Sequence, residues 1–378
     1  MNTAFRLLMA AIKKKDSKTL IDRTTPVTVV NSDYDISGNG GRKLIKLNNG
    51  LLVAGIIDIP NRGYRLYKST DNGNTWDLFV TDTGYKTNFN SLSLVAMGNN
   101  IGVLFGIDND TQEFITYNSN GVIVSPKIVL DLQTAIDNCS LAINSAGTEL
   151  HACWSSKNST YPNGFNIRYC KGTINADGSV TWGNVEQVST NGDDYFNYID
   201  PAIIINNDMP VIICKCFFII YFFSKMNSTW SVKSIYNGYG EQFSPSACVD
   251  KDGIIHIVWH GVDNVLNENR VRYIYSVDGG VTWSKELLIY NANDRTENPS
   301  IITNNNGDVF VSFTDYSVVN NPLYIFKKSY GDTEFKIYYT YSSGELSSIC
   351  DYSDFESPLI IFKDSKNSSI KFFGKWYE

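Results

Sequence analysis

The sequence predicts an all-β fold built from repeated hairpins, and three observations support this prediction. Tyr, Phe, Val and Ile, which favour strands, are abundant among the 378 residues, and long runs of helix formers are missing after residue 25. An eight-residue phrase recurs along the chain, as described below. Turn dipeptides typical of hairpins also divide the chain: Asn49-Gly50, Asn72-Gly73, Asn120-Gly121, Asp177-Gly178, Asp252-Gly253, Gly279-Gly280 and Asn306-Gly307.

The recurring phrase is Ser-x-Asp-x-Gly-x-Thr-Trp. It is complete at residues 69–76 and again at residues 276–283. Partial copies occupy residues 119–122, 177–182, 224–230 and 329–335. The copies follow one another at about fifty residues, and a period of this length with four short strands per unit is typical of a propeller blade.

An apolar strand, a turn and a second apolar strand precede each copy, as in residues 43–57, 244–259 and 299–313. Seven such units can be counted, but the last has no room for its outer strand before residue 378. The segment Thr25–Val30 matches the missing strand, and closing a ring removes exposed sheet edges. We therefore expect a single β-propeller over residues 26–378, with seven four-stranded antiparallel blades and the N-terminal strand closing the ring. Six blades are the alternative.

Residues 1–25 differ from the rest, because Thr3–Ile12 has helical propensity and a basic stretch, Lys13-Lys14-Lys15, follows it. We expect a helical or flexible tail here, which could dock the protein to other subunits of a particle. The order of apolar and basic residues does not match a secretory signal, so we expect synthesis in the cytoplasm and, as one setting, association with a virion or similar particle.

Charge and cysteine content exclude several functions. The net charge is −7 and the pI about 5.1, which argues against nucleic-acid binding, and no apolar stretch is long enough for membrane insertion. Seven scattered Cys and three His contain no zinc-ligand spacing, so we expect no metal centre or other cofactor. The only weak cation signal is the oxygen-rich segment 108–110, which could bind calcium.

The repeated phrase resembles the Asp-box, or BNR repeat, of the sialidase-like propellers. The resemblance implies that each copy forms a hairpin between the third and fourth strands of a blade, in which the Asp holds the turn and the Trp packs between blades. The residues to which it assigns these structural roles are Asp71, Trp76, Asp177, Trp182, Asp278 and Trp283.

The same resemblance raises the question of sialidase activity, which needs an Arg cluster for the substrate carboxylate and an acidic acid/base residue. The nearest matches are Arg42, Asp58, Arg62 and Arg295. Arg42 is followed by Lys43-Leu44 instead of the Ile-Pro of the family, and the loop from Asp58 is short. We therefore assign no catalytic residue, and we favour binding alone over enzymatic activity.

Loops that leave the second strand of each blade gather on one face around the channel and are the expected ligand-binding site. Aromatic rings beside carboxylates and other polar groups suit sugars. The candidates from these loops are Asp58, Asp108, Tyr161, His260, Glu268, Asp315 and Tyr316.

From these observations we expect non-catalytic glycan recognition, by a lectin-like or receptor-binding module, in a setting such as a phage-tail-like particle. The first alternative is an exo-glycosidase of the sialidase type that removes terminal sialic acids. The second alternative is a structural platform for protein interactions, without a sugar ligand.

Overall fold

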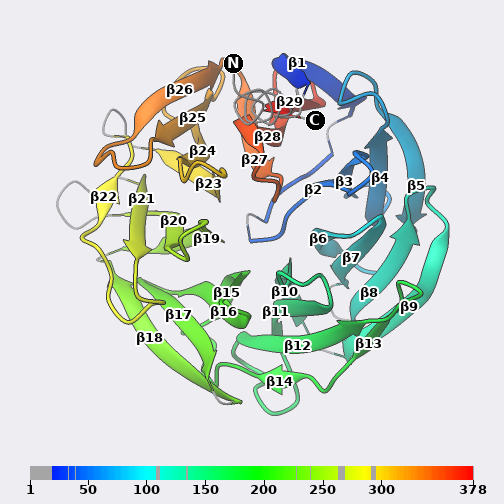
Figure 1. Cartoon of the computed structure of the whole chain (residues 1–378). Helices are drawn as coiled ribbons and strands as arrows, with labels where there is room; N and C mark the ends of the chain where they lie inside the picture. The colour runs from blue at the N-terminus through cyan, green and yellow to red at the C-terminus, as the bar shows by residue number, and fades with distance from the viewer. Residues whose placement is uncertain are drawn as a thin grey trace, which may run out of the picture.

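The computed structural model describes residues 19–32, 34–38, 40–107, 111–132, 135–226, 228–238, 240–262, 269–290 and 295–377. Over these ranges the chain contains strands and no helix. The strands form seven antiparallel sheets arranged as a ring, the seven-bladed β-propeller that the repeat predicts (Figure 1). The first strand of each blade lies nearest the centre of the ring and the fourth lies outermost.

The first three blades follow one another in chain order. Blade 1 contains β2 (Leu44–Lys46), β3 (Leu52–Asp58), β4 (Gly63–Ser69) and β5 (Asp77–Thr83). Blade 2 contains β6 (Phe89–Met97), β7 (Asn100–Ile107), β8 (Thr111–Asn118) and β9 (Ile123–Leu132). Blade 3 contains β10 (Ala135–Ile143), β11 (Glu149–Lys157), β12 (Asn166–Ile174) and the short β13 (Val180–Trp182) and β14 (Glu186–Gln187), which both pair with β12.

The remaining blades follow the same order, except that the last one is completed by the start of the chain. Blade 4 contains β15 (Tyr198–Asn206), β16 (Met209–Cys216), β17 (Ile219–Met226) and β18 (Thr229–Asn237). Blade 5 contains β19 (Gln242–Val249), β20 (Ile255–Val262), β21 (Asn269–Ser276) and β22 (Leu287–Leu288). Blade 6 contains β23 (Thr296–Thr303), β24 (Val309–Asp315), β25 (Leu323–Lys328) and β26 (Lys336–Tyr341). Blade 7 contains β27 (Gly344–Ile349), β28 (Phe355–Asp364), β29 (Ser369–Tyr377) and β1 (Leu20–Asn31).

The ring is closed by β1, which pairs antiparallel with β29 from Leu20↔Tyr377 to Asn31↔Ser369. The strand begins at Leu20, several residues before the boundary that the sequence suggested. The Lys371 ammonium donates to the Thr28 hydroxyl at 2.6 Å and supports the pairing. The proposed tail, residues 1–18, lies outside the described residues.

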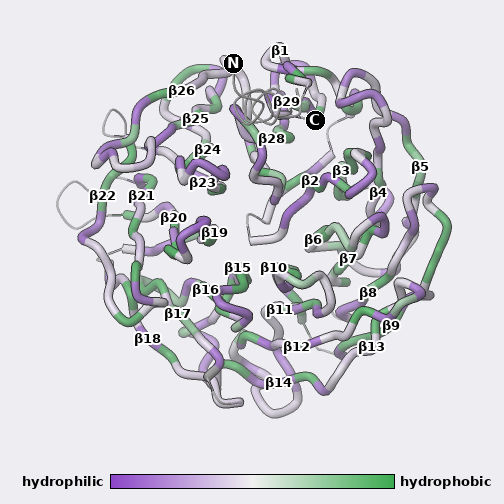
Figure 2. Tube along the Cα trace, viewed as in Figure 1, coloured by the Kyte–Doolittle hydropathy of each residue, from purple (hydrophilic) through white to green (hydrophobic). Residues whose placement is uncertain are grey.

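Hydrophobic residues occur along the strands of all seven blades (Figure 2). The second strands are apolar and buried along nearly their whole length, as in β3 and β7, so each sheet presents hydrophobic side chains to both neighbouring blades. An aromatic side chain from the connection between the third and fourth strands, or from the fourth strand itself, packs against an aromatic side chain on the third strand of the preceding blade. In five blades the ring centroids lie 5.0 to 5.3 Å apart with interplanar angles of 60° or more, a geometry that favours aromatic pairs. These pairs are Trp76–Phe372, Trp182–Phe114, Trp230–Tyr169, Trp283–Phe222 and Phe335–Tyr273.

The Asp residues of the repeated phrase hold their turns through side-chain acceptor bonds. Asp71 accepts bonds from the amide and hydroxyl of Thr75 at 2.8 and 2.6 Å, and Asp278 accepts the same pair of bonds from Thr282. Asp177 accepts two bonds from Ser179 in a tighter turn. These bonds to the charged form lower the pKa of Asp278 to about 2.

After β1 the chain crosses the central channel before it enters β2 (Figure 1). This crossing segment, residues 34–38 and 40–43, contacts all seven blades. Its Gly40 has no room for a side chain, because a Cβ there would lie 2.0 Å from the Pro201 carbonyl oxygen of blade 4. The remaining blades are contacted through backbone and side-chain pairs: Asp35↔Ile57, Arg42–Leu94, Gly40–Ser140, Arg42–Ala247, Arg42–Ile301 and Lys43–Ser348.

Candidate functional site

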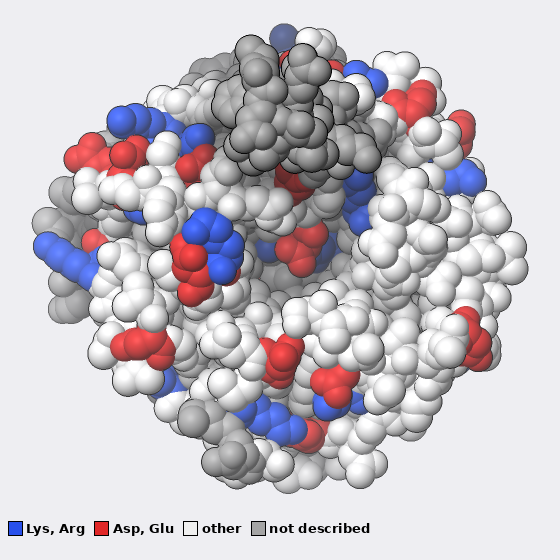
Figure 3. Space-filling model, viewed as in Figure 1, with Lys and Arg blue, Asp and Glu red and all other residues white. Residues whose placement is uncertain are grey.

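The second strand of each blade ends beside the start of the first strand, because the two strands pair antiparallel, as in Phe243↔His260. The residues that end the second strands therefore surround one mouth of the channel. Figure 3 shows a hollow in the middle of the ring with acidic and basic side chains inside it.

Acidic residues at this position are used to hold their own turns. Asp58 is fully buried, accepts a bond from the Arg65 guanidinium at 2.7 Å and accepts two bonds from the Asn61 amide. Asp315 is also fully buried and accepts bonds from the amide and hydroxyl of Ser317 at 3.0 and 2.5 Å. The equivalent carboxylates are thus occupied by local partners, the arrangement expected of turn-forming Asp side chains.

The arginines proposed for a sialidase-type clamp lie apart from one another. Arg42 donates to the carbonyl oxygens of Ala247 and Ile301 inside the channel. Arg62 donates to the Lys86 carbonyl oxygen at 2.8 Å on the rim of blade 1, and the exposed Arg295 pairs with Glu297 at 2.8 Å on blade 6. No shared position for a substrate carboxylate follows from these contacts.

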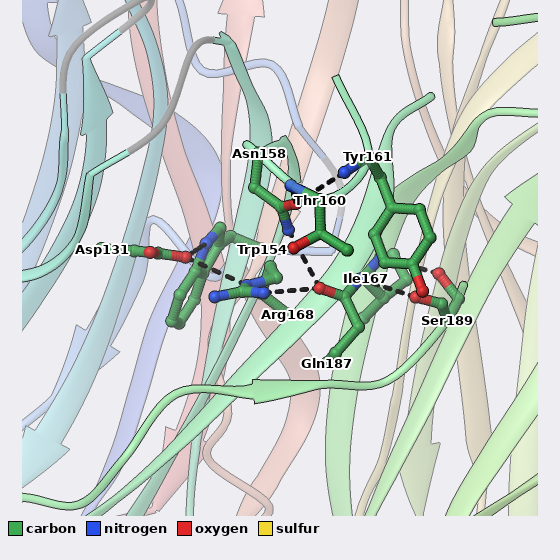
Figure 4. A network of polar contacts seen from close by, with 9 residues as sticks. All are labelled: Asp131, Trp154, Asn158, Thr160, Tyr161, Ile167, Arg168, Gln187 and Ser189. Carbon is green, nitrogen blue, oxygen red and sulfur yellow. Dashed lines mark hydrogen bonds and ion pairs between the residues drawn. The ribbon is translucent and has the colours of Figure 1, made fainter. Parts of the chain in front are cut away.

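Tyr161 lies in the turn of blade 3, where the Asn158 side chain accepts bonds from the backbone amides of residues 160 and 161 at 2.9 Å (Figure 4). The same view shows Arg168 paired with Asp131 at 3.1 Å, so this guanidinium joins blade 3 to blade 2. Blade 4 separates Tyr161 from the blade that carries His260. Asp108 and Glu268 lie outside the described residues, as does the segment 108–110.

Two other predicted residues, His260 and Tyr316, are brought together with three that were not among the predicted ligand-binding residues. We call this set the mouth cluster: Lys215, Phe243, His260, Asn298 and Tyr316. It spans blades 4, 5 and 6. The Phe243 ring stacks on the His260 imidazole with centroids 5.3 Å apart, and the Lys215 ammonium lies 4.1 Å from the centroid of the Phe243 ring. Asn298 links His260 to Tyr316. Its backbone N–H donates to His260 Nδ1 and its side-chain amide donates to the Tyr316 hydroxyl, both at 3.3 Å.

The protonation states of the cluster follow from burial and from one another. Burial and the Lys215 ammonium lower the pKa of His260 to about 3, so its imidazole is neutral at physiological pH. Because Nδ1 accepts the bond from Asn298, the proton of the neutral ring lies on Nε2. Burial and the charge of Glu345 raise the pKa of Tyr316 to about 12, so its hydroxyl remains a donor. The cluster therefore offers a hydroxyl, an imidazole N–H and a cation around an aromatic ring.

A repeated backbone feature explains why Asn298 and Phe243 face the mouth. The first strands of blades 4, 5 and 6 each contain a bulge at a residue with positive φ followed by proline: Asp200-Pro201, Ser244-Pro245 and Asn298-Pro299. A bulge turns the side chains beside it out of the regular alternation, and bulges are frequent next to binding sites. The recurring Pro at the start of the inner strands was the sequence signal that could have revealed this.

Two hollows lie elsewhere around the channel. One of about 410 Å³ is lined by residues of blades 1 to 3 and of the crossing segment: Asp35, Ile59, Arg62, Asn88, Phe89 and Asp137. Another of about 160 Å³ is lined mainly by aliphatic residues of the inner strands of blades 3, 4 and 5, together with Arg42 and Asp351.

No protein-family model and no curated protein sequence matches the chain. Solved structures do match. A polysaccharide lyase of family PL25, an ulvan lyase bound to -[GlcA(1-4)Rha3S]-, has a TM-score of 0.64 and 12% identity over 94% of this chain and 96% of that chain. An α-L-arabinanase from Penicillium chrysogenum has a TM-score of 0.54 and 14% identity over 94% of this chain and 98% of that chain. The similarity to these two structures shows the fold. The NanB sialidase from Streptococcus pneumoniae has a TM-score of 0.48 and 13% identity over 98% of this chain and 71% of that chain, and we draw no argument from it.

Three further observations concern the described part of the chain. All seven Cys are buried and free. No group of three or more His, Cys, Asp or Glu side chains that could hold a metal ion occurs among the described residues. No helix within the described ranges could cross a membrane.

Proposed function

We propose that the protein recognises a glycan at the mouth cluster. The convergence of His260 and Tyr316 from different blades on Asn298, which donates its backbone N–H to the imidazole and its side-chain amide to the phenol hydroxyl, carries this proposal. A neutral imidazole, a phenol hydroxyl and an amide bond well to sugar hydroxyls, and a ring such as Phe243 packs against the C–H face of a sugar. Such groups held by a rigid scaffold are typical of small-molecule and sugar sites.

The names of the structural neighbours support the same class of ligand. The ulvan lyase, with the highest TM-score of the three structures described above, and the arabinanase are both named for action on polysaccharides. At 12 to 14% identity they share the fold with this chain, so the specific chemistry has to come from its own residues. The Asp-box relationship suggested by the repeated phrase is part of this proposal.

Binding without cleavage is the leading form of the proposal. The carboxylates at the ends of β3 and β24 hold turns, and the arginines required by the sialidase pattern are separated. The protein would then act as a lectin-like or receptor-binding module, and the residues that precede β1 would attach it to a larger particle.

A glycan-cleaving enzyme is the second candidate. The specific observation that favours it is the pairing of a neutral imidazole with a tyrosine hydroxyl around Asn298, since such groups can remove and supply protons. An exo-sialidase is the narrower form of this alternative, and it would need Arg42, Asp58, Arg62 or Arg295 to contribute. If no sugar binds, the remaining proposal is a structural platform for protein interactions.

The test is a glycan array probed with the full chain, followed by calorimetric titration of the best ligand. We expect binding that His260→Ala and Tyr316→Ala weaken by about tenfold or more, measured at a temperature at which circular dichroism shows both variants to be folded. Val319→Ala, in the same loop and 84% exposed, is the matched control and should bind normally. Unchanged affinity in both cluster variants would refute this site. Appearance of new reducing ends or of unsaturated sugars would promote the enzyme.

A further inference from the structure

An aromatic cluster lies on the surface of blade 4, next to the mouth cluster. It consists of Tyr195, Phe196 and Phe217, which we call the aromatic platform. Tyr195 lies 5.1 Å from Phe196 and 4.9 Å from Phe217, measured between ring centroids. Tyr195 is 61% exposed and Phe196 47% exposed, so the rings pack mainly on one another and face solvent.

The turn that carries Phe217 departs from the usual chemistry of such turns. Phe217 and Phe218 form the two-residue connection between Cys216 and Ile219, which pair with each other. Phe217 has a φ of +55°, a conformation that Gly or Asn adopts readily and that a bulky side chain adopts at a cost. Backbone strain of this kind at a residue other than glycine is typical of functional positions.

The loop beneath the platform is held in place by polar contacts with blade 3. Asn166 bonds to the backbone of Asn191 through both its side-chain oxygen and its side-chain nitrogen, at 2.7 and 2.8 Å. The Asn197 side chain accepts a bond from the Phe165 amide at 2.8 Å. A platform fixed before a ligand arrives loses little conformational entropy when the ligand binds.

Lys215 gives the neighbouring site its charge preference. Its side chain comes from the strand that leads into Phe217, and the residue is only 8% exposed. Among the described residues its ammonium has neither an ion-pair nor a hydrogen-bond partner, and its contact is the face of Phe243. A cation that has lost most of its water and has no carboxylate beside it can form a strong charge-assisted bond with an anionic group.

The aromatic platform adjoins the Lys215 ammonium. The Gln242 amide donates to the Phe217 carbonyl oxygen at 3.2 Å, and the next residue, Phe243, supports Lys215. An acid group on one sugar could therefore reach Lys215 while an adjacent sugar stacks on the aromatic rings.

We propose that the ligand of this site is an acidic oligosaccharide of at least two sugars, whose anionic group pairs with Lys215 and whose neighbouring sugar packs on the aromatic platform. This inference rests on the proposed glycan recognition and names its ligand class. The anionic group can be a carboxylate of a uronic or sialic acid or a sulfate ester, because all three have the same attraction for an ammonium.

The experiment uses the full chain on an array that carries uronate-containing, sialylated, sulfated and neutral oligosaccharides, with titration calorimetry of the strongest ligand and of its single constituent sugars. We expect binding to be confined to acidic oligosaccharides, and the acidic arm that binds identifies the anionic group. Lys215→Met should weaken this binding by about tenfold or more, whereas Lys215→Arg should retain part of it.

Phe217→Gly separates binding from folding, because it relieves the positive φ while it removes the ring. We expect an unchanged or higher melting temperature together with affinity for the oligosaccharide about tenfold lower, and no change for the single sugar. Tyr195→Ala should behave in the same direction. Tyr330→Ala, which removes an equally exposed aromatic ring from a turn of blade 6, is the control and should bind normally.

Two negative outcomes are distinguishable. If neutral and acidic glycans bind equally well, or if Lys215→Met and Phe217→Gly both bind as the parent does, the acidic-ligand inference is overturned while glycan recognition stands. If no glycan on the array binds, both proposals are wrong.

Discussion

Blades 1 and 5 place different polar side chains near the end of the second strand. In blade 1 this residue is Asp58, which is fully buried and saturated by Arg65 and Asn61. In blade 5 the second strand continues to Val262, and His260, two residues before its end, is also buried but accepts a hydrogen bond from Asn298 of blade 6. A polar side chain near the end of a second strand can therefore either hold its own turn or bond to the neighbouring blade, and the difference lies in whether the local turn satisfies the side chain.

The largest expected effect follows from removing the saturated group. Asp58→Ala leaves the Arg65 guanidinium without its carboxylate and removes the acceptor for Asn61, so we expect the free energy of unfolding to fall by about 3 kcal/mol. Urea denaturation measures this change. Asp77→Ala, an exposed carboxylate on the same blade, should change stability by no more than about 0.5 kcal/mol. Equal effects of the two substitutions would show that the Asp58 contacts do not support the blade.

Trp283, at the other end of blade 5, tests whether a substitution away from the mouth cluster affects glycan binding only by destabilising the fold. Trp283 packs edge-on against Phe222 of blade 4 and is half-buried, so Trp283→Ala should cost about 2–3 kcal/mol, below the range for fully buried aromatic residues. Thermal denaturation and glycan titration below the new melting temperature check it. Loss of glycan affinity in the fully folded variant would contradict a purely structural role for this tryptophan.

The neutral His260 makes a prediction about pH. Its pKa in the folded protein is about 3, below the value of about 6.5 for an exposed histidine, so below pH 6.5 the unfolded chain binds a proton that the folded chain does not. Stability should then fall with decreasing pH by about 1.4 kcal/mol per unit between pH 6.5 and pH 5 for each such histidine. Buried His151, with its pKa lowered to about 4, contributes in the same window.

Denaturation curves at several pH values for the parent and for His260→Gln resolve the contribution of His260. The variant should lose stability less steeply between pH 6.5 and pH 5, because only His151 remains. Identical slopes would mean that His260 is already protonated in the folded protein, and the cluster would then carry a second positive charge.

The smallest effect is expected at the rim of the same site. Arg295 is exposed and pairs with Glu297, and exposed ion pairs of this kind contribute about 0.2–1 kcal/mol. Arg295→Ala should therefore leave the urea midpoint nearly unchanged. A stability loss of several kcal/mol would show that the rim of blade 6, unlike that of blade 5, depends on its charged groups.

Much of the architecture was predictable because it repeats. The Ser-x-Asp-x-Gly-x-Thr-Trp phrase at residues 69–76 and 276–283 specifies a turn by local hydrogen bonds and a contact between blades by its Trp, so its spacing reports blade length. The missing outer strand of the last blade indicated closure by Thr25–Val30, and the pairing of β1 with β29 confirms it. The sequence predicted His260 as a ligand-binding residue because it was expected to end its strand, and this ground was wrong, since the strand continues to Val262.

The amino-acid sequence by itself determined the all-β class, the seven blades and the N-terminal strand that closes them, because these depend on strand alternation and turn chemistry within a few residues. Only the tertiary structure decided which polar groups meet. Lys215, Phe243 and Asn298 belong to three different blades, and Arg42, which resembled a clamp residue, is bonded to carbonyl groups across the channel. Such contacts depend on how the ring closes and on the bulges of the inner strands, and no spacing along the chain encodes the distance between side chains that lie in separate blades.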